Sequence, residues 1–258
     1  YTARSIRNFC ERIGVAKSPN TVEYGFLEHC LREDLNATAQ RTMAVLHPVK
    51  LTVTNYPEGQ SETFTVENNP TDPTQGTHEI TFGRHLWIET EDFLEMPIPK
   101  YKRLYPDGPE CRLKGAYLIR CTGCVKDEAG NVVEVLCEYD PESKGGNPAD
   151  GRKVKGTIHW VNARDCAPFE ARLYDQLMTE EWDTAEAADK KDVTKFLSDT
   201  SLQVMNGYCE HALVSAKPGD TFQFLRNGYF CKDPDSTQAL SVFNRTVPLK
   251  DSWAKTQK

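Results

Sequence analysis

The first 46 residues carry apolar side chains at helical spacing. Ile6, Phe9 and Ile13 recur three or four positions apart, which is the period of one helix face. Gly14 ends this run, and Ser18-Pro19-Asn20-Thr21 supplies a turn and a cap for a second one. The pattern predicts two short helices at the start of the chain.

After Pro48 the apolar period changes to two, which is the period of a β-strand. Residues 50–54 and 61–66 alternate on either side of Tyr56-Pro57-Glu58-Gly59, so they are predicted to form a hairpin. The clearest hairpin runs from 115 to 139. Further strands are predicted at 78–82, 85–90, 155–161, 201–206, 221–225, 228–231 and 241–247. Many short strands separated by turns predict a β-sandwich or a pair of barrels behind a helical lead-in.

Composition limits the range of functions. The chain has 258 residues, 38% of them hydrophobic, and no apolar run approaches the roughly 18 residues of a membrane helix. A net charge of −7 disfavours indiscriminate binding to DNA or to an anionic membrane, so a nucleic-acid site has to be a local patch. Nine cysteines, an odd number, fit a reducing cytoplasm.

Because the chain starts at Tyr1 and shows no signal-peptide pattern, it is expected to be a segment of a larger cytoplasmic protein. Residues 179–195 are polar and acidic, which predicts an exposed helix or a mobile insertion.

Motifs for catalysis or metal binding are few. Cys121 and Cys124 form a lone CxxC, for which ordinary packed cysteines are favoured over zinc ligands. Cys137 is expected to lie opposite Cys121 if the hairpin turns at Ala129. The histidines show no HExxH-like spacing, and no GxSxG elbow or glycine-rich phosphate loop occurs. No catalytic residue and no metal ligand is predicted.

Basic residues alternate with tyrosines in Lys100-Tyr101-Lys102-Arg103-Leu104-Tyr105 and again in Arg112-Leu113-Lys114-Gly115-Ala116-Tyr117. Interpreted as strands, both segments present cations on one face and are able to line one groove. Cations bind phosphates and tyrosines stack on unpaired bases, which is the chemistry of single-stranded RNA recognition. The alternative is a solvated strand face. Gln223, between Phe222 and Phe224, suits a base edge, although a glutamine on a strand is usually only solvated.

Several long stretches follow one another in an order found in a known family. Two are Gly151-Arg152-Lys153-Val154-Lys155-Gly156-Thr157-Ile158-His159-Trp160-Val161 and Phe222-Gln223-Phe224-Leu225-Arg226-Asn227-Gly228-Tyr229-Phe230-Cys231. The others lie at 6–15, 32–36, 43–51, 101–104, 172–175 and 242–247. Together they resemble the C-terminal half of glutaminyl-tRNA synthetase over nearly the whole chain.

The resemblance implies a mainly β fold. It consists of two six-stranded antiparallel β-barrels, of a kind also found in a ribosomal protein, after a short N-terminal helical connector. Residues 1–48 would end the connector, 49–96 plus 200–258 would form the proximal barrel, and 97–199 would form the distal barrel. The two ends of the chain would then be near neighbours.

The resemblance also implies which residues read the anticodon. Arg41, Gln223 and Arg226 would surround the middle base. Lys102 and Arg103 would serve the third base.

The first base and the RNA backbone have their own implied contacts. Arg112 and Lys114 would hold the first base, although lysine lacks the bidentate fork of arginine. Asn36 would lie close to the RNA backbone. Pro70 would lie in a loop that approaches the anticodon, where Thr71 departs from the asparagine expected beside it.

The implied role is recognition. The partners would be the anticodon loop of glutamine tRNA and the catalytic domain of the same protein, with no DNA, no membrane and a monomeric state. The HIGH-like and KMSKS-like signatures, with which this family binds ATP, do not occur in these residues. ATP with magnesium and the ligation of glutamine would therefore belong to the missing catalytic domain. The segment alone would be inactive. Three alternatives stay open: the anticodon-binding region of a glutamyl-tRNA synthetase, a non-catalytic β-barrel module that binds ribosomal RNA or protein, and an enzyme that uses Asp, His or Cys.

Overall fold

The computed structural model describes residues 1–148, 150–179, 181–186 and 189–251. The chain opens with two helices, α1 (Ala3–Ile13) and α2 (Tyr24–Thr38), as the apolar spacing predicts. Thr2 caps α1 by accepting a hydrogen bond from the backbone N–H of Ser5, and Gly14 ends the helix with a φ of 67°. The expected cap of the second helix at 18–21 is wrong: the N-cap of α2 is Glu23, which makes no side-chain capping bond.

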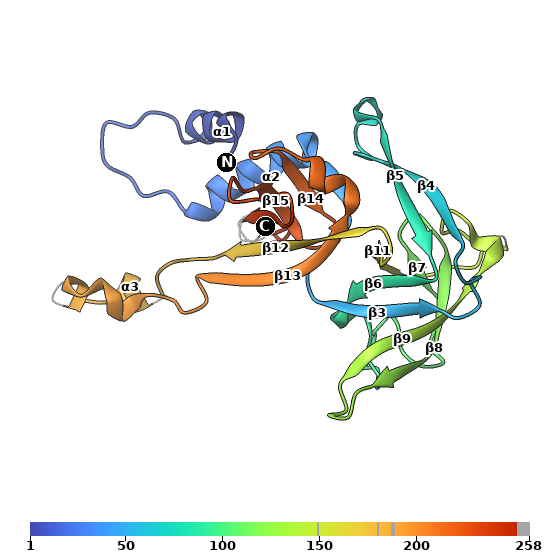
Figure 1. The fold of residues 1–258 in the computed structure, drawn as a ribbon. Coiled ribbons are helices and arrows are strands. Elements are labelled where there is room, and N and C mark those ends of the chain that lie inside the picture. The colour runs from blue at the N-terminus through green and yellow to red at the C-terminus, as the bar shows by residue number, and fades with distance from the viewer. Residues whose placement is uncertain (149, 180, 187–188, 252–258) are drawn as a thin grey trace.

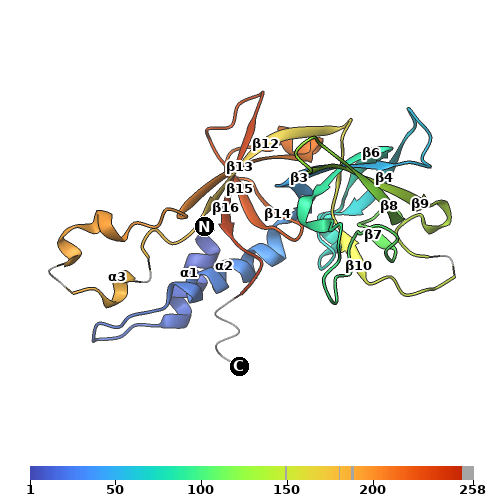
Figure 2. The same cartoon turned by 90° about the horizontal axis from the view of Figure 1, so that it is seen from below.

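Seven strands form the first sheet, here called the proximal sheet, which packs against α2 (Figures 1 and 2). Its edge strands β1 and β2 are separated in sequence by Met43 alone, so the sheet curls until its two edges meet. In spatial order the strands are β1 (Gln40–Thr42), β14 (Thr221–Phe224), β15 (Gly228–Lys232), β16 (Ser241–Val247), β12 (Cys166–Tyr174), β13 (Leu202–Glu210) and β2 (Ala44–Val45).

Seven further strands form the second sheet, here called the distal sheet. Its edge strands are separated only by His159 and Trp160, so it also curls into a nearly closed barrel. In spatial order the strands are β10 (Gly156–Ile158), β7 (Cys111–Leu113), β8 (Leu118–Lys126), β9 (Val132–Asp140), β3 (Pro48–Val53), β6 (His85–Glu89) and β11 (Val161–Asn162). A separate hairpin of β4 (Ser61–Glu67) and β5 (Thr77–Gly83) projects from this barrel in Figure 1.

The mainly β, barrel-like fold class is confirmed, and the details of the two barrels differ from the expectation. Each sheet has seven strands instead of six, and neither is purely antiparallel. The parallel pairs are β1 with β14, β12 with β16, β3 with β9, and β7 with β10. The chain leaves the proximal sheet, builds the distal one and returns, so β1 meets β14 from the far side of this excursion. The other three parallel pairs join strands of one sheet that are separated in sequence by further strands of the chain.

The strands are also grouped differently from the expected division. β6 and all but the first residue of β3 fall within 49–96 and belong to the distal sheet, whereas β12, within 97–199, belongs to the proximal sheet. The expected hairpin of 50–54 with 61–66 does not form, because β3 pairs with β6 and β9 while β4 pairs with β5. An alternating pattern predicts that a strand exists but does not name its partner.

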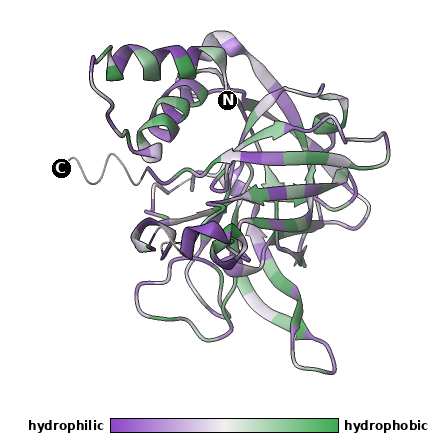
Figure 3. Cartoon of the chain, turned by 90° about the vertical axis from the view of Figure 1, so that its left-hand side faces the viewer, coloured by the Kyte–Doolittle hydropathy of each residue, from purple (hydrophilic) through white to green (hydrophobic). Residues whose placement is uncertain are grey.

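Each barrel encloses an aromatic core. In the distal barrel, Trp160 is fully buried and its ring meets Phe82 edge to face. In the proximal barrel, Phe224 stacks on Phe230 at a centroid distance of 4.3 Å. Figure 3 shows hydrophobic and hydrophilic residues alternating along the strands, as expected when one face of each sheet is buried in a barrel. Between the barrels, Trp87 of β6 stacks on Tyr208 of β13 at 4.8 Å, so a stacked pair joins the two sheets.

The long strands β12 and β13 extend beyond the proximal barrel as a two-stranded arm (Figure 1). The arm leads to α3 (Glu181–Thr184), a four-residue helix within the stretch where an exposed helix or an insertion is predicted. At the other end of the chain, the C-terminal segment returns to the helical lead-in, because Arg32 Nε donates to the carbonyl oxygen of Pro248 over 2.8 Å. Among the described residues, no helix combines the length and the apolar character needed to span a membrane.

Candidate nucleic-acid interface

Three of the nine predicted contact residues meet where α2 ends and the proximal sheet begins. Arg41 on β1 lies in register with Gln223 on β14, and Arg41 Nη2 donates to Asn36 Oδ1 over 3.2 Å. Gln223 is buried and donates to the Tyr229 hydroxyl over 3.2 Å, and that hydroxyl donates to Asn36 Oδ1 over 3.4 Å. The simple interpretation of Gln223 as a solvated strand residue is therefore wrong. Asn36, Arg41 and Gln223 form one hydrogen-bonded group with Tyr229.

Pro70 lies beside this group, at the tip of the β4–β5 hairpin. The neighbouring Asn69 is fully buried, and its Nδ2 donates to the carbonyl oxygens of Asn36 and Ala37 over 3.3 and 3.2 Å. These bonds satisfy carbonyl groups that the end of α2 leaves free. Thr71, where the resemblance is imperfect, donates both its N–H and its hydroxyl to Asn69 Oδ1. The hairpin tip is thus fixed to α2 while Pro70 stays exposed.

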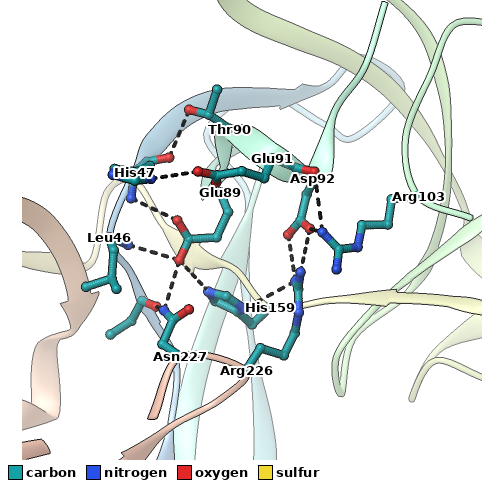
Figure 4. A network of polar contacts seen from close by, with 11 residues as sticks. Leu46, His47, Glu89, Thr90, Glu91, Asp92, Arg103, His159, Arg226 and Asn227 are labelled. Atoms are coloured by element: carbon teal, nitrogen blue, oxygen red, sulfur yellow. Dashed lines mark hydrogen bonds and ion pairs between the residues drawn. The ribbon is translucent and has the colours of Figure 1, made fainter. Parts of the chain in front are cut away.

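A second group joins the two barrels through one carboxylate, Asp92, which ends the 3₁₀ helix η2 (Thr90–Asp92) directly after β6 (Figure 4). Arg226 binds it in a bidentate fork, with Nη1–Oδ2 and Nη2–Oδ1 distances of 2.6 Å. Arg103 Nη1 lies 2.9 Å from Oδ1 of the same carboxylate. Asp92 is completely buried, whereas the two arginine side chains are 30% and 38% exposed. One hidden anion therefore holds two accessible guanidinium groups.

The backbone and the charge of Arg226 are both unusual. Its φ is 70°, a left-handed conformation that is uncommon outside glycine and that places the residue in the tight turn between β14 and β15. Burial alone would lower the pKa of its guanidinium, but the hydrogen bonds and the charge of Asp92 raise that pKa. Among the described residues, its Nε has no hydrogen-bond partner, so that donor remains available.

Glu89 supports the same junction on the other side of His159 from Asp92 (Figure 4). It accepts the backbone N–H groups of Leu46 and His47, and its Oε1 lies 2.9 Å from Asn227 Nδ2 and 3.1 Å from His159 Nε2. Burial would raise the pKa of Glu89, but the bonds to His159, Asn227 and the backbone bring it down to about 2. The carboxylate therefore stays ionised and ties β6 to the turn that carries Arg226.

The segment 100–105 is not a strand. Lys100 has a φ of 69°, which a strand does not allow, and the segment forms turns with a single bridge at Leu104. The backbone N–H of Leu104 donates to the Asp92 carbonyl oxygen over 3.0 Å, which places the segment against η2. As a result Arg103 points to Asp92, while the side chain of Lys102 is exposed.

Arg112 and Lys114 form a third group on the distal sheet. Arg112 on β7 is half-buried, and its Nη1 donates to Thr157 Oγ1 over 3.2 Å, while its Nε bonds the Gly146 carbonyl oxygen. Lys114 lies just past the end of β7, with an exposed side chain and a backbone that bonds to Ile158. The two residues are therefore close in the fold, but only Arg112 is fixed by its side chain.

The structure also answers the cysteine and metal questions for the described residues. Cys121 and Cys137 are direct partners across β8 and β9, as expected. One cluster of possible metal ligands is present among the described residues, formed by His47, Glu89 and Glu91. The Glu89 oxygens already accept the hydrogen bonds named above, so we assign this cluster a structural role.

Sequence reasoning missed the residues that organise these groups, above all Asp92, Glu89 and Tyr229. An acidic residue after a strand is normally solvated, so nothing in the local pattern marks Asp92 as buried. Tyr229 lies within the stretch that carries the resemblance, and its strand position opposite Gln223 is the signal that was available.

Comparison with known proteins decides the family. A model described as "tRNA synthetases class I (E and Q), anti-codon binding domain" matches residues 39–140, and a second model with the same description matches residues 157–233. The chain belongs to this anticodon-binding family. Curated relatives named glutamine–tRNA ligase are 50% identical over 254 residues in Clostridium perfringens and 51% identical over 256 residues in Vibrio cholerae. The two matches cover 98% and 99% of this chain but only 45% of each relative. The chain therefore spans about half the length of the curated relatives that it matches.

Proposed function

We propose that this chain binds the anticodon loop of glutamine tRNA as the C-terminal part of a glutamine–tRNA ligase. The observation that carries the proposal is the junction between the two barrels, where buried Asp92 presents the guanidinium groups of Arg103 and Arg226 together. Guanidinium forks hydrogen-bond base edges and phosphates, and this pair is pre-positioned before RNA arrives. The curated relatives, all named for glutamine, favour glutamine tRNA.

Each contact group has a proposed task in this reading. Arg41 and Gln223, with Arg226 three residues further along the chain, surround the middle anticodon base, and Asn36 and Pro70 lie against the neighbouring backbone. Lys102 and Arg103 serve the third base. Arg112 and Lys114 hold the first. These assignments follow the family resemblance, and the hydrogen-bonded groups described above support them by bringing several of the residues together.

The reaction itself is proposed for the parent protein. ATP with magnesium and the ligation of glutamine are assigned to the catalytic domain, which this chain would contact in cis through its helical lead-in. We further propose a monomer that works in the cytoplasm. The chain alone is expected to bind tRNA without aminoacylating it.

The test is a binding experiment with transcripts of glutamine and glutamate tRNA and with single anticodon substitutions. The proposal predicts tighter binding of the glutamine transcript at every salt concentration, because base contacts persist where phosphate contacts weaken. Equal affinity, or preference for the glutamate transcript, contradicts the glutamine assignment. Absence of any anticodon effect supports the rival β-barrel module, which would bind ribosomal RNA or protein.

A further inference from the structure

A depression on the distal sheet gathers positive charge in a chain that is acidic overall. Five cationic side chains, a tyrosine and a single carboxylate, Glu110, contribute to its wall, and Pro109, Val154 and Gly156 complete it. The cations and the tyrosine are Tyr101, Lys102, Arg120, Arg152, Lys153 and Lys155.

Only one of these cations is neutralised. Arg152 binds three carboxylates, with 2.7 Å contacts to Glu110 and Asp140 and a 2.9 Å contact to Asp150. The remaining four, Lys102, Arg120, Lys153 and Lys155, are exposed and have no ion-pair partner among the described residues. Arg152 thus holds the loop in place, and the free cations set the sign of the electric field in the depression.

The backbone fixes this depression between two proposed base-reading groups. A Cβ on Gly156 would lie 2.0 Å from the Lys102 carbonyl oxygen, so the Lys102 segment packs directly on strand β10. On its other side β10 pairs in parallel with β7, placing Thr157 opposite Arg112. The depression therefore includes the Lys102 segment, and its Gly156 wall lies on the strand that pairs with the strand of Arg112.

We infer that this depression is a phosphodiester-binding site that grips the RNA backbone between nucleotides read by those two groups. The inference rests on the proposed function and extends it to residues Arg120, Lys153 and Lys155. Ammonium groups bind phosphates as point charges without reading sequence, and Tyr101 offers a ring for base stacking. A free phosphate anion shares this chemistry, so the experiment has to separate the two sources.

The experiment compares the double variant Lys153→Ala/Lys155→Ala with Lys17→Ala/Lys217→Ala in the 258-residue chain. Lys17 and Lys217 are exposed, unpaired among the described residues and outside the depression, so both variants lose the same charge. Binding of the glutamine transcript is measured across a range of KCl concentrations, and the slope of log K against log salt is compared. Thermal midpoints of both variants are measured as a check on folding.

The site variant is expected to flatten the salt slope by about 0.7 for each lost phosphate contact, with the ratio of affinities for native and altered anticodons unchanged. The control variant keeps the native slope. A site variant that folds and keeps the native slope overturns the inference. The second source, free phosphate, is tested by adding inorganic phosphate at constant ionic strength. If phosphate raises the thermal midpoint only when both lysines are present, and the salt slopes for RNA are equal in the native chain and the site variant, the site binds free phosphate and the inference is overturned. Absence of anticodon discrimination in the native chain would instead defeat the proposed function.

Discussion

Replacing Asp92 by asparagine removes one charge from a completely buried position and leaves the shape of the side chain nearly unchanged. The carboxylate anchors three short contacts, two of 2.6 Å to Arg226 and one of 2.9 Å to Arg103. Asparagine offers one acceptor oxygen and an amide that repels a guanidinium donor. The fork of Arg226 therefore cannot form in the variant.

The cost follows from burial and from the partners that remain. Removing one member of a buried ion pair costs about 3–5 kcal/mol, and an exposed pair contributes only about 0–1 kcal/mol. The side chains of Arg226 and Arg103 are 30% and 38% exposed, so water rehydrates both guanidinium groups in part. We expect Asp92→Asn to lower the free energy of unfolding by about 2–3 kcal/mol, between these limits.

Urea unfolding followed by tryptophan fluorescence measures this loss. Asp199→Asn is the matched control, because Asp199 is exposed and its substitution removes the same charge, with an expected change within about 0.5 kcal/mol. Transcript binding should weaken as well, with the loss concentrated at the anticodon bases that Arg103 and Arg226 contact. Unfolding of Asp92→Asn at the same urea concentration as the control would show that the Asp92 carboxylate does not stabilise the junction.

Three further substitutions test the site. Arg226→Lys removes the fork, so transcript affinity should fall by about 1–3 kcal/mol with relaxed base discrimination, and unchanged discrimination would contradict a base contact. The pKa of Glu89 is lowered to about 2, below its unfolded value, so the stability that Glu89 contributes is present above pH 4.5 and is lost as the pH falls toward 2. Glu89→Gln should therefore make the thermal midpoint less dependent on pH in this range. The same pH dependence in the variant and the native chain would contradict this role. Gly156→Ala would bring a Cβ to 2.0 Å from the Lys102 carbonyl oxygen, so it should lower the thermal midpoint and weaken transcript binding. Gly123→Ala, where a Cβ meets nothing within 4 Å, should do neither, and equal effects of the two would refute the close approach.

Local patterns predicted most of the elements but not their partners, and they did not predict the nine-residue strand β12. The hairpin of β8 and β9 was predicted with Cys121 opposite Cys137, and the structure pairs them. Two register shifts lie between this pair and the turn, so the turn alone does not set the pairing. β3 was predictable as a strand, but its pairing with β9 depends on contacts some 80 residues away in sequence. The parallel pairs likewise join strands that are not consecutive in sequence, and periodicity does not encode which of these strands meet.

The candidate site divides in the same way. The cationic residues were predicted as RNA contacts because lysine and arginine bind phosphates and base edges. The family resemblance then indicated which of them contact the anticodon. Asp92 was not predicted because a buried carboxylate is stable only beside specific cations, and the partner that forms the bidentate pair, Arg226, lies 134 residues away in sequence. The predicted strand at 100–105 failed because Lys100 adopts a left-handed conformation that residue type alone does not reveal.

The most direct test of the central claim is the affinity of the 258-residue chain for glutamine-tRNA transcripts that differ only in the anticodon, measured over a series of KCl concentrations. We expect each anticodon substitution to weaken binding, and we expect the ratio of affinities to the native transcript to persist as salt rises, since base contacts survive where phosphate contacts are screened. Identical affinities for all anticodons at every salt concentration would contradict it.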